Sequence, residues 1–322
     1  MITHPTVLVL GAGASAPYGF PTGAELRSQI IGELACPVAS PLGKTLMGAG
    51  FREQQIQSFA DEFGNSAWNS VDQFLEHRPD HLSVGKAAIA AALIPHETMG
   101  KLFRAVDPEE DWYRYLFNAM ACSFDEFQNN KLSIITYNYD RSLEQHWLKA
   151  LLAFNKPVAV CYEKLKSIPI LHLHGTLGEF INGPKNYRPY SDDSTPDMIT
   201  RASDSILIIH ETNHASAGFG RARELIQAAE RICFLGFGYD QRNVERLVGT
   251  DRLFQNKILT GTAYGLTWAE KYSAHSRLAT YVPPFFDDVS EEWDCRRLLR
   301  ESGILTNFLA KWIQIWPKPP AA

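Results

Sequence analysis

The chain begins with a short apolar run that ends in a glycine-rich turn. Residues Thr6 to Leu10 are β-branched or aliphatic throughout, and Gly11-Ala12-Gly13-Ala14-Ser15 follows them. A run of this kind is typical of a strand buried on both faces in a parallel sheet. Thr22, with Glu25 three residues later, forms a capping-box pattern that starts a helix reaching about Leu34. Strand, glycine turn and helix follow one another in the order that is typical of a dinucleotide-binding unit.

The rest of the chain divides into two stretches with different predicted secondary structure. From residue 131 strands and helices alternate again, whereas residues 36 to about 130 have apolar residues at helical spacing and many alanines. The pattern predicts strands over 132–136, 157–162, 168–174, 231–235 and 257–266, with a weaker one over 205–209. It predicts helices over 87–93, 112–127, 140–154, 219–230, 241–248 and 268–278, one or two more over 291–316, and a loop over 182–196.

We therefore expect a Rossmann-like α/β fold, a parallel sheet with helices on both faces, plus a helical insertion or subdomain. The α/β domain would comprise residues 1–35 and 130–285, and the insertion residues 36–129. Residues 286–322 would form a C-terminal helical extension. As an alternative, part of the insertion would lie beside the sheet as ordinary crossovers.

Composition narrows the class of protein. The net charge is -5 and no run of lysine and arginine occurs, which argues against direct binding of nucleic acid. The five cysteines are scattered without a Cys-x-x-Cys pair, which argues against disulfides and against a cysteine zinc site. Neither a signal peptide nor an apolar stretch of membrane-spanning length is visible, so we expect a cytoplasmic protein without a membrane contact and without a metal.

The glycine turn matches the dinucleotide pattern G-x-G-x-x-A through Gly11, Gly13 and Ala16. Gly11 would permit the tight turn, and Gly13 would let backbone N–H groups approach a pyrophosphate. The acidic residue that usually follows about 20 residues later at the end of a second strand is missing. Glu33 falls near that distance but inside the predicted helix, which disfavours a dehydrogenase.

Polar residues follow a second buried strand. Thr136-Tyr137-Asn138-Tyr139-Asp140 ends that strand and precedes a helix, and the carboxyl ends of parallel strands line the ligand crevice. Asn138 and Asp140 alternate onto one side of an extended chain. The alternative is that Asp140 only caps the following helix and Asn138 is a turn residue.

Two more strand ends carry polar or glycine residues. His172 and His174 precede Gly175 and would share a face of a regular strand, although a histidine on a sheet is most often structural. Phe234-Leu235-Gly236-Phe237-Gly238-Tyr239-Asp240, with Asn243 beyond it, repeats the strand-and-glycine pattern. Gly236 and Gly238 would let the backbone approach a phosphate or ribose, or would simply form a turn.

Together these motifs resemble the sirtuin-like superfamily. The order Gly-Ala-Gly-Ala-Ser, Gly19-Phe20-Pro21, Thr-Tyr-Asn-Tyr-Asp, His174-Gly175 and Gly-Phe-Gly is similar to that of its prokaryotic anti-phage defence branch, over roughly residues 5–35 and 130–270. Protein-deacylating sirtuins carry a zinc module with two Cys-x-x-Cys pairs, which this chain lacks. The departure puts protein deacylation in doubt and leaves the chemistry on NAD itself.

The resemblance implies roles for individual residues. Asn138 would position water or ribose hydroxyls, Asp140 would hold the nicotinamide carboxamide, and His174 would act as the general base, since histidine can accept a proton near neutral pH. The implied NAD contacts are Gly11, Ala12, Gly13 and Ser15 at the phosphates, Phe20, Pro21 and Thr136 elsewhere in the site, and Gly236 and Gly238 on the adenosine side.

The resulting expectation is an NAD hydrolase that releases nicotinamide and linear or cyclic ADP-ribose, with NAD as substrate. In the resembled branch such an enzyme depletes NAD in an abortive, antiviral response, so we expect a homo-oligomer or a partner defence protein to restrain it. The helical insertion is a candidate contact surface. A nucleotide-binding regulatory module without turnover and a zinc-independent deacylase are the alternatives.

Overall fold

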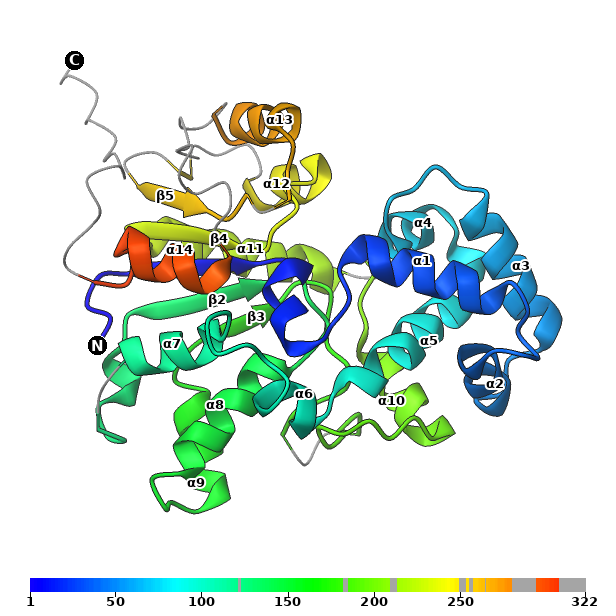
Figure 1. Cartoon of the computed structure of the whole chain (residues 1–322), viewed down its shortest axis with the longest axis horizontal. Helices are drawn as coiled ribbons and strands as arrows, with labels where there is room; N and C mark the ends of the chain where they lie inside the picture. Colours follow the sequence, from blue (N-terminus) through cyan, green and yellow to red (C-terminus); the bar gives the residue numbers. More distant parts are fainter. Residues whose placement is uncertain are drawn as a thin grey trace.

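The computed structural model describes residues 1–120, 123–181, 185–208, 213–248, 253–254, 257–263, 265–279 and 294–306. Its centre is a five-stranded sheet with the strand order β3-β2-β1-β4-β5, and every strand pairing is parallel. The strands are β1 (Thr6–Leu10), β2 (Leu132–Thr136), β3 (Ile170–His172), β4 (Arg231–Leu235) and β5 (Ile258–Gly261). Helices surround the sheet, which confirms the expected Rossmann-like α/β fold (Figure 1).

The central strand β1 buries both of its faces. Val7 and Val9 belong to one apolar cluster, and Leu8 and Leu10 to another, as the period of two in a strand requires. The leucine side packs against α7 (Trp112–Ala119), α8 (Ser142–Leu152) and α14 (Cys295–Ser302). The valine side packs against α11 (Asn213–Ala228), α12 (Gln241–Val248) and α13 (Trp268–Ala279). Helices therefore cover both faces, which explains why this strand contains no polar alternation.

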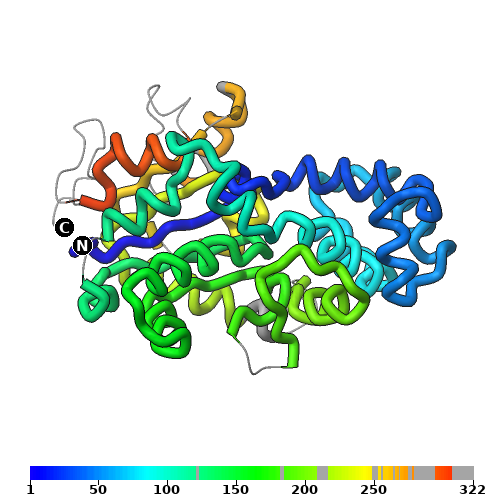
Figure 2. Tube along the Cα trace, turned by 60° about the horizontal axis from the view of Figure 1, so that its bottom comes forward, coloured from blue at the N-terminus to red at the C-terminus, as the bar shows by residue number. Residues whose placement is uncertain are grey.

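A group of helices lies to one side of the sheet (Figures 1 and 2). It contains α1 (Gly23–Leu34), α2 (Pro41–Gly48), α3 (Glu53–Gly64), α4 (Val71–His77), α5 (Leu82–Leu93) and α10 (Pro196–Ser205). Helix α5 is buried along most of its length, and the other members of the group contact it. We call these six helices the helical group. The short helices α6 (Met99–Phe103) and α9 (Val158–Leu165) lie outside it.

Helix α1 begins where the sequence predicts. The Thr22 N–H donates to Glu25 Oε2 over 2.7 Å, and the Glu25 N–H donates to Thr22 Oγ1 over 3.4 Å, so both halves of the capping box are present. The helix then packs against α2, α3 and α5. Helix α7, by contrast, falls within residues 36–129 yet covers the sheet. The structure thus combines a separate helical group with a part of this stretch that lies beside the sheet.

Two strand predictions are wrong. Residues 158–162 belong to α9, with Pro157 as its N-cap; Cys161 and Leu165 are buried one helical turn apart, while Val158 and Val160 stay exposed. The β-branched residues here mark an exposed helix surface. Helix α10 continues to Ser205, and Ile206 forms only an isolated bridge with Gly175, so 205–208 is not a strand.

The remaining predicted elements are present, some with the expected ends and some with shifted ends. Strands β1, β2 and β4 and helix α12 have the expected bounds, whereas β3 and β5 are shorter and α7 ends at Ala119. Residues 182–184 of the predicted loop, residue 209, and residues 286–293 and 307–322 of the C-terminal extension lie outside the described residues.

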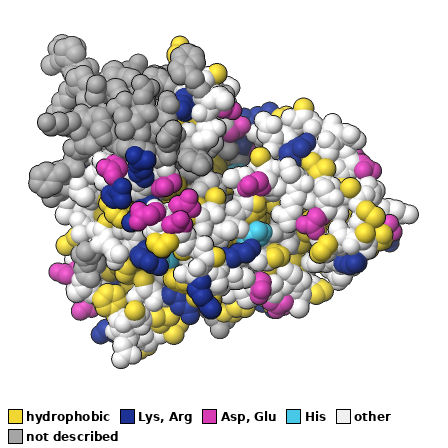
Figure 3. Space-filling model, in the orientation of Figure 1, with side chains coloured by type: hydrophobic (Ala, Val, Ile, Leu, Met, Phe, Trp, Pro, Cys, Tyr) yellow, Lys and Arg dark blue, Asp and Glu magenta, His cyan; other side chains and the backbone are white. Residues whose placement is uncertain are grey.

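Charged side chains of both signs are interspersed on the face shown in Figure 3. In the described ranges, no helix is both long enough and apolar enough to cross a membrane. Nor do three or more His, Cys, Asp or Glu side chains of these same residues gather in a way that could hold a metal ion.

Candidate functional site

A cavity of about 670 Å³ opens at the carboxyl ends of β1, β2 and β4. The strand order reverses between β1 and β4, and such a switch point is where doubly wound sheets bind ligands. The volume lies in the range of roughly 300–1,000 Å³ that is usual for small-molecule sites. The predicted site residues that line the cavity are Gly11, Ala12, Gly13, Ser15, Phe20, Pro21, Asn138, Asp140, His174, Gly236 and Gly238.

Two glycine loops pack directly against each other at the switch point. Gly13 donates its N–H to the Gly236 carbonyl over 3.0 Å, and Gly11 donates to the Leu235 carbonyl over 3.0 Å. Gly236 has φ +55°, and a Cβ there would lie 2.0 Å from the Ala14 nitrogen. These positions therefore require glycine because two backbones meet, a different reason from the expected approach to a pyrophosphate.

The N–H groups of Gly11 and Gly13 are thus used within the protein and are not presented to a ligand. Two other N–H groups of this segment remain. Within the stretch that the structure describes, Ala12 and Ala16 donate to no protein acceptor, and both residues line the cavity. They are the backbone donors of this loop that could meet an anionic group.

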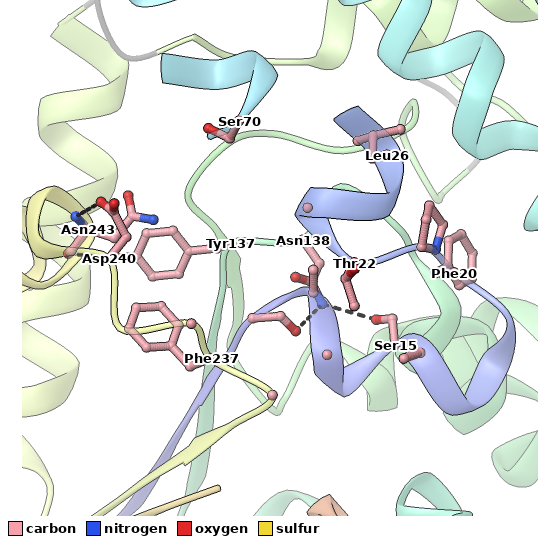
Figure 4. Close-up of a pocket in the computed structure, with 18 of the residues that line it drawn as sticks. Ser15, Phe20, Thr22, Leu26, Ser70, Tyr137, Asn138, Phe237, Asp240 and Asn243 are labelled. Atoms are coloured by element: carbon pink, nitrogen blue, oxygen red, sulfur yellow. Dashed lines mark hydrogen bonds between the residues drawn. The ribbon is translucent and has the colours of Figure 1, made fainter. Parts of the chain in front are cut away.

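Asn138 joins the glycine loop to the end of β2. Its Nδ2 donates to the Gly11 carbonyl over 2.9 Å and to Ser15 Oγ over 3.0 Å. Figure 4 shows the amide between these two acceptors. Because both amide hydrogens are donated, the orientation of the side chain is defined and Oδ1 is the atom left to accept a hydrogen bond from a ligand.

Ser15 passes the connection on to Asp140. Its Oγ donates to Asp140 Oδ2 over 2.7 Å, while Asp140 Oδ1 accepts the N–H and hydroxyl of Ser142. Burial raises the pKa of Asp140, and the hydrogen bonds from Ser142 and Ser15 oppose that rise. Arg141, and not Asp140, is the N-cap of α8. Asp140 nevertheless accepts the N–H of Ser142, the first helical residue, and its other oxygen binds Ser15 at the cavity.

The neighbours of His174 are side chains outside this network. It is 5% exposed, and its ring lies 5.6 Å from the Tyr137 ring and 6.0 Å from the Tyr139 ring, between ring centroids. Its Nδ1 is buried without a hydrogen-bond partner in the described residues and lies 4.0 Å from Asp72 Oδ1. An imidazole in such a place can accept a proton from a bound molecule.

His172 has different partners and does not line the cavity. Its Nδ1 bonds with the Asn138 carbonyl over 2.8 Å, and its Nε2 lies 2.6 Å from Glu144 Oε1. Burial alone would lower the pKa of His172, but the Glu144 carboxylate and the bond to Asn138 raise it above its usual range. His172 thus positions the backbone that carries Asn138.

Thr136 and the Phe20-Pro21 turn occupy different places. Thr136 is buried and does not line the cavity. Its Oγ1 accepts the Asn138 N–H over 3.0 Å and so helps to fix the Asn138 backbone. Phe20 and Pro21 line the cavity beside the start of α1. Figure 4 shows Phe20 on the opposite side of Asn138 from Tyr137 and Phe237.

The sequence gives little indication that the helical group completes the site. Asp72, Gln73 and Glu76 of α4 all line the cavity. Gln73 Nε2 donates to Asp240 Oδ2 over 3.0 Å, and Glu76 accepts two bonds from Arg246 over 2.7 and 2.9 Å. These contacts hold α4 against α12 across the cavity. The only sequence signal is the placing of two acids four residues apart on a short helix.

Charged groups of both signs face the same space. The lining residues with carboxylates are Asp72, Glu76, Glu110, Asp140, Asp240 and Asp294, and those with guanidinium groups are Arg242 and Arg246. Both arginines pair with Glu76: Arg246 Nη1 lies 2.7 Å from Glu76 Oε1, and Arg242 Nη1 lies 3.8 Å from Glu76 Oε2. The side chain of Arg242 is 40% exposed, and its guanidinium lies 4.8 Å from the Trp68 ring centroid. The cavity can therefore accept a ligand with a cationic part and an anionic part.

No protein-family model matches the chain, and no curated protein matches it by sequence.

Proposed function

We propose that the protein hydrolyses the bond between nicotinamide and ribose in NAD. The observation that carries the proposal is the placing of Asn138 Oδ1, as an oriented acceptor, in the same cavity as the His174 imidazole. Asn138 follows β2 and His174 follows β3, and both line the cavity at the switch point between β1 and β4, where nucleotides bind in this class of fold. The order of the motifs, which resembles that of sirtuin-like proteins, supports the same conclusion.

The chemistry requires little from the protein beyond positioning and electrostatics. Water forms a bond to the ribose carbon, the bond to nicotinamide breaks, and the water gives up a proton. Nicotinamide leaves as a neutral molecule because its ring was cationic. The ribose becomes oxocarbenium-like on the way, and acidic side chains such as Asp72 and Asp140 favour positive charge at that place.

Each residue has a specific part in this proposal. Asn138 Oδ1 accepts a hydrogen bond from the attacking water or from a ribose hydroxyl. His174 takes the proton that the water or hydroxyl releases, a contribution of about 10²- to 10⁴-fold in rate. Ser15 holds Asn138 and Asp140 in register, and Asp140 accepts a hydrogen bond from the nicotinamide carboxamide in this proposal. The N–H groups of Ala12 and Ala16 and the Arg242 guanidinium are available for the phosphates.

Such an activity must be restrained in a living cell, since it destroys a central cofactor. We propose that the protein is an NAD-depleting effector of antiviral defence in the cytoplasm. Self-assembly or a partner protein would control it, with the exposed side of the helical group as the contact surface. The proposal rests on the resemblance and on the toxicity of unrestrained NAD loss.

Purified protein incubated with NAD tests the activity directly. We expect nicotinamide and ADP-ribose in equal amounts, with chromatography distinguishing the linear from the cyclic form. If neither the protein alone nor its native complex releases nicotinamide, and NAD still binds, the protein is a binding module. If NAD loss depends strictly on an acyl-lysine peptide, it is a deacylase.

A further inference from the structure

We infer that Asp72, contributed by the helical group, is the positioning residue for His174, an inference that rests on the proposed function. Asp72 lies in the first turn of α4, far from His174 in the sequence. Its Oδ1 is 4.0 Å from His174 Nδ1. That nitrogen is buried and has no other partner in the described part of the chain. A small rotation of either side chain closes this distance to a hydrogen bond.

The position of Asp72 is itself fixed by the strand-end motif. Tyr139, which lies between Asn138 and Asp140 in the sequence, donates its hydroxyl to Asp72 Oδ1. Alternate residues of the motif thus serve opposite sides: Asn138 and Asp140 connect to Ser15, and Tyr139 connects to Asp72. One extended segment therefore contacts both the glycine loop, through Ser15, and the helical group, through Asp72.

The contacts of α4 with α12 keep this carboxylate in place. Glu76, one turn beyond Asp72, forms its two bonds with Arg246, and Gln73 bonds with Asp240. Besides His174 and the Tyr139 hydroxyl, the charged groups that act on Asp72 are Glu76 and Arg246. Burial raises the pKa of Asp72, while the charge of His174 opposes the rise.

The consequence concerns the ring nitrogens of His174. A carboxylate at Nδ1 favours the tautomer with the proton on Nδ1, because only that form donates to Asp72. Nε2 is then unprotonated and can accept the proton released in the reaction. Without Asp72, no residue that the structure describes is left to select this tautomer through Nδ1. The alternative is that Asp72 acts only on α4, since an acid in the first turn stabilises a helix.

Long-range ¹H–¹⁵N NMR of the histidine rings separates these two roles. The chain has 10 histidines, and the His174 signals are assigned as those missing from His174→Ala. We expect the Nδ1–H tautomer in the wild-type protein and a loss of that preference in Asp72→Ala. Asp61→Ala, an acid-to-alanine change at an exposed position of α3 that does not line the cavity, should keep the wild-type tautomer.

NAD turnover provides the second measurement. In Asp72→Ala we expect kcat to fall roughly 10- to 100-fold, less than in His174→Ala, while KM changes little, because the base is misoriented and the substrate is still held. An Nε2–H tautomer in the wild type, or the same tautomer with and without Asp72, would overturn the inference. Absence of NAD cleavage by the wild type would overturn the proposed function instead, and the tautomer comparison would still decide the role of Asp72.

Discussion

Ser15 Oγ donates a 2.7 Å hydrogen bond to Asp140 Oδ2 and so joins the loop after β1 to the loop after β2. Ser15 also accepts from Asn138, which in turn donates to the Gly11 carbonyl. The serine is 3% exposed. Its position at the centre of this network means that the two strand ends depend on one hydroxyl for their register.

Ser15→Ala should therefore damage the site more than it damages the fold. One Asn138 hydrogen and one Asp140 oxygen lose their partner, which costs about 1–3 kcal/mol of stability for buried polar groups. We expect NAD turnover to fall at least roughly tenfold, which corresponds to about 1.4 kcal/mol in the barrier. Steady-state kinetics together with urea unfolding test this. Unchanged turnover in a folded variant would mean that the network does not position the reacting groups.

Gly236→Ala should destabilise the protein strongly. Its φ of +55° is unfavourable for alanine, and the new Cβ would meet the Ala14 nitrogen at 2.0 Å. We expect a loss of at least about 2 kcal/mol in the free energy of unfolding. Gly238→Ala is the matched control, since a Cβ there has nothing within 4 Å, and it should stay within about 0.5 kcal/mol of the wild type. Equal unfolding midpoints for the two variants would contradict the close packing of the two loops.

The His172–Glu144 pair should make stability depend on pH. The pKa of His172 is raised in the folded protein, so its contribution is fully present below the unfolded value of about 6.5. The contribution is lost as the pH rises through the folded value. The difference in unfolding free energy between wild type and His172→Gln should thus be larger at pH 6 than at pH 9. A difference that does not vary over this range would show that the pair carries no linked proton.

The Glu76–Arg246 pair should couple α4 to α12. The side chain of Glu76 is 2% exposed, and both of its oxygens accept from Arg246. A double-mutant cycle with Glu76→Gln and Arg246→Gln should give a coupling energy of about 1–3 kcal/mol in urea unfolding. The Arg300–Glu301 pair, exposed on α14, is the control and should give less than about 1 kcal/mol. Additive effects at Glu76 and Arg246 would indicate that this contact does not hold the helices together.

The sheet and the site residues at the strand ends were predictable, because the local pattern of apolar and polar residues determines them. Continuous apolar runs predicted β1 and β4, and the parallel arrangement then brings Asn138, Asp140 and His174 to one edge. The reason for the glycines was not predictable, since the contact of Gly13 with Gly236 joins residues far apart in the sequence. Asp72 was not predictable either, because an acid at the start of a helix is ordinary until the fold places it beside a histidine.

In the α9 segment the local sequence pattern predicted the wrong element, a strand where the structure has a helix. Its valines favour a strand by propensity. Pro157 precedes the first helical residue, and burial of Cys161 and Leu165 on one side stabilises a helix instead. Tertiary packing overrides propensity in short segments such as this one.

The central claim is tested most directly by NAD turnover in the wild-type protein, Asn138→Ala and His174→Ala, with product identification and with any native partner present. We predict that the wild type releases nicotinamide and ADP-ribose, and that each variant loses about 10²-fold or more of that rate while it remains folded. Equal nicotinamide release by all three proteins, or none by the wild type under any of these conditions, would contradict the assignment of this cavity as a site of NAD cleavage.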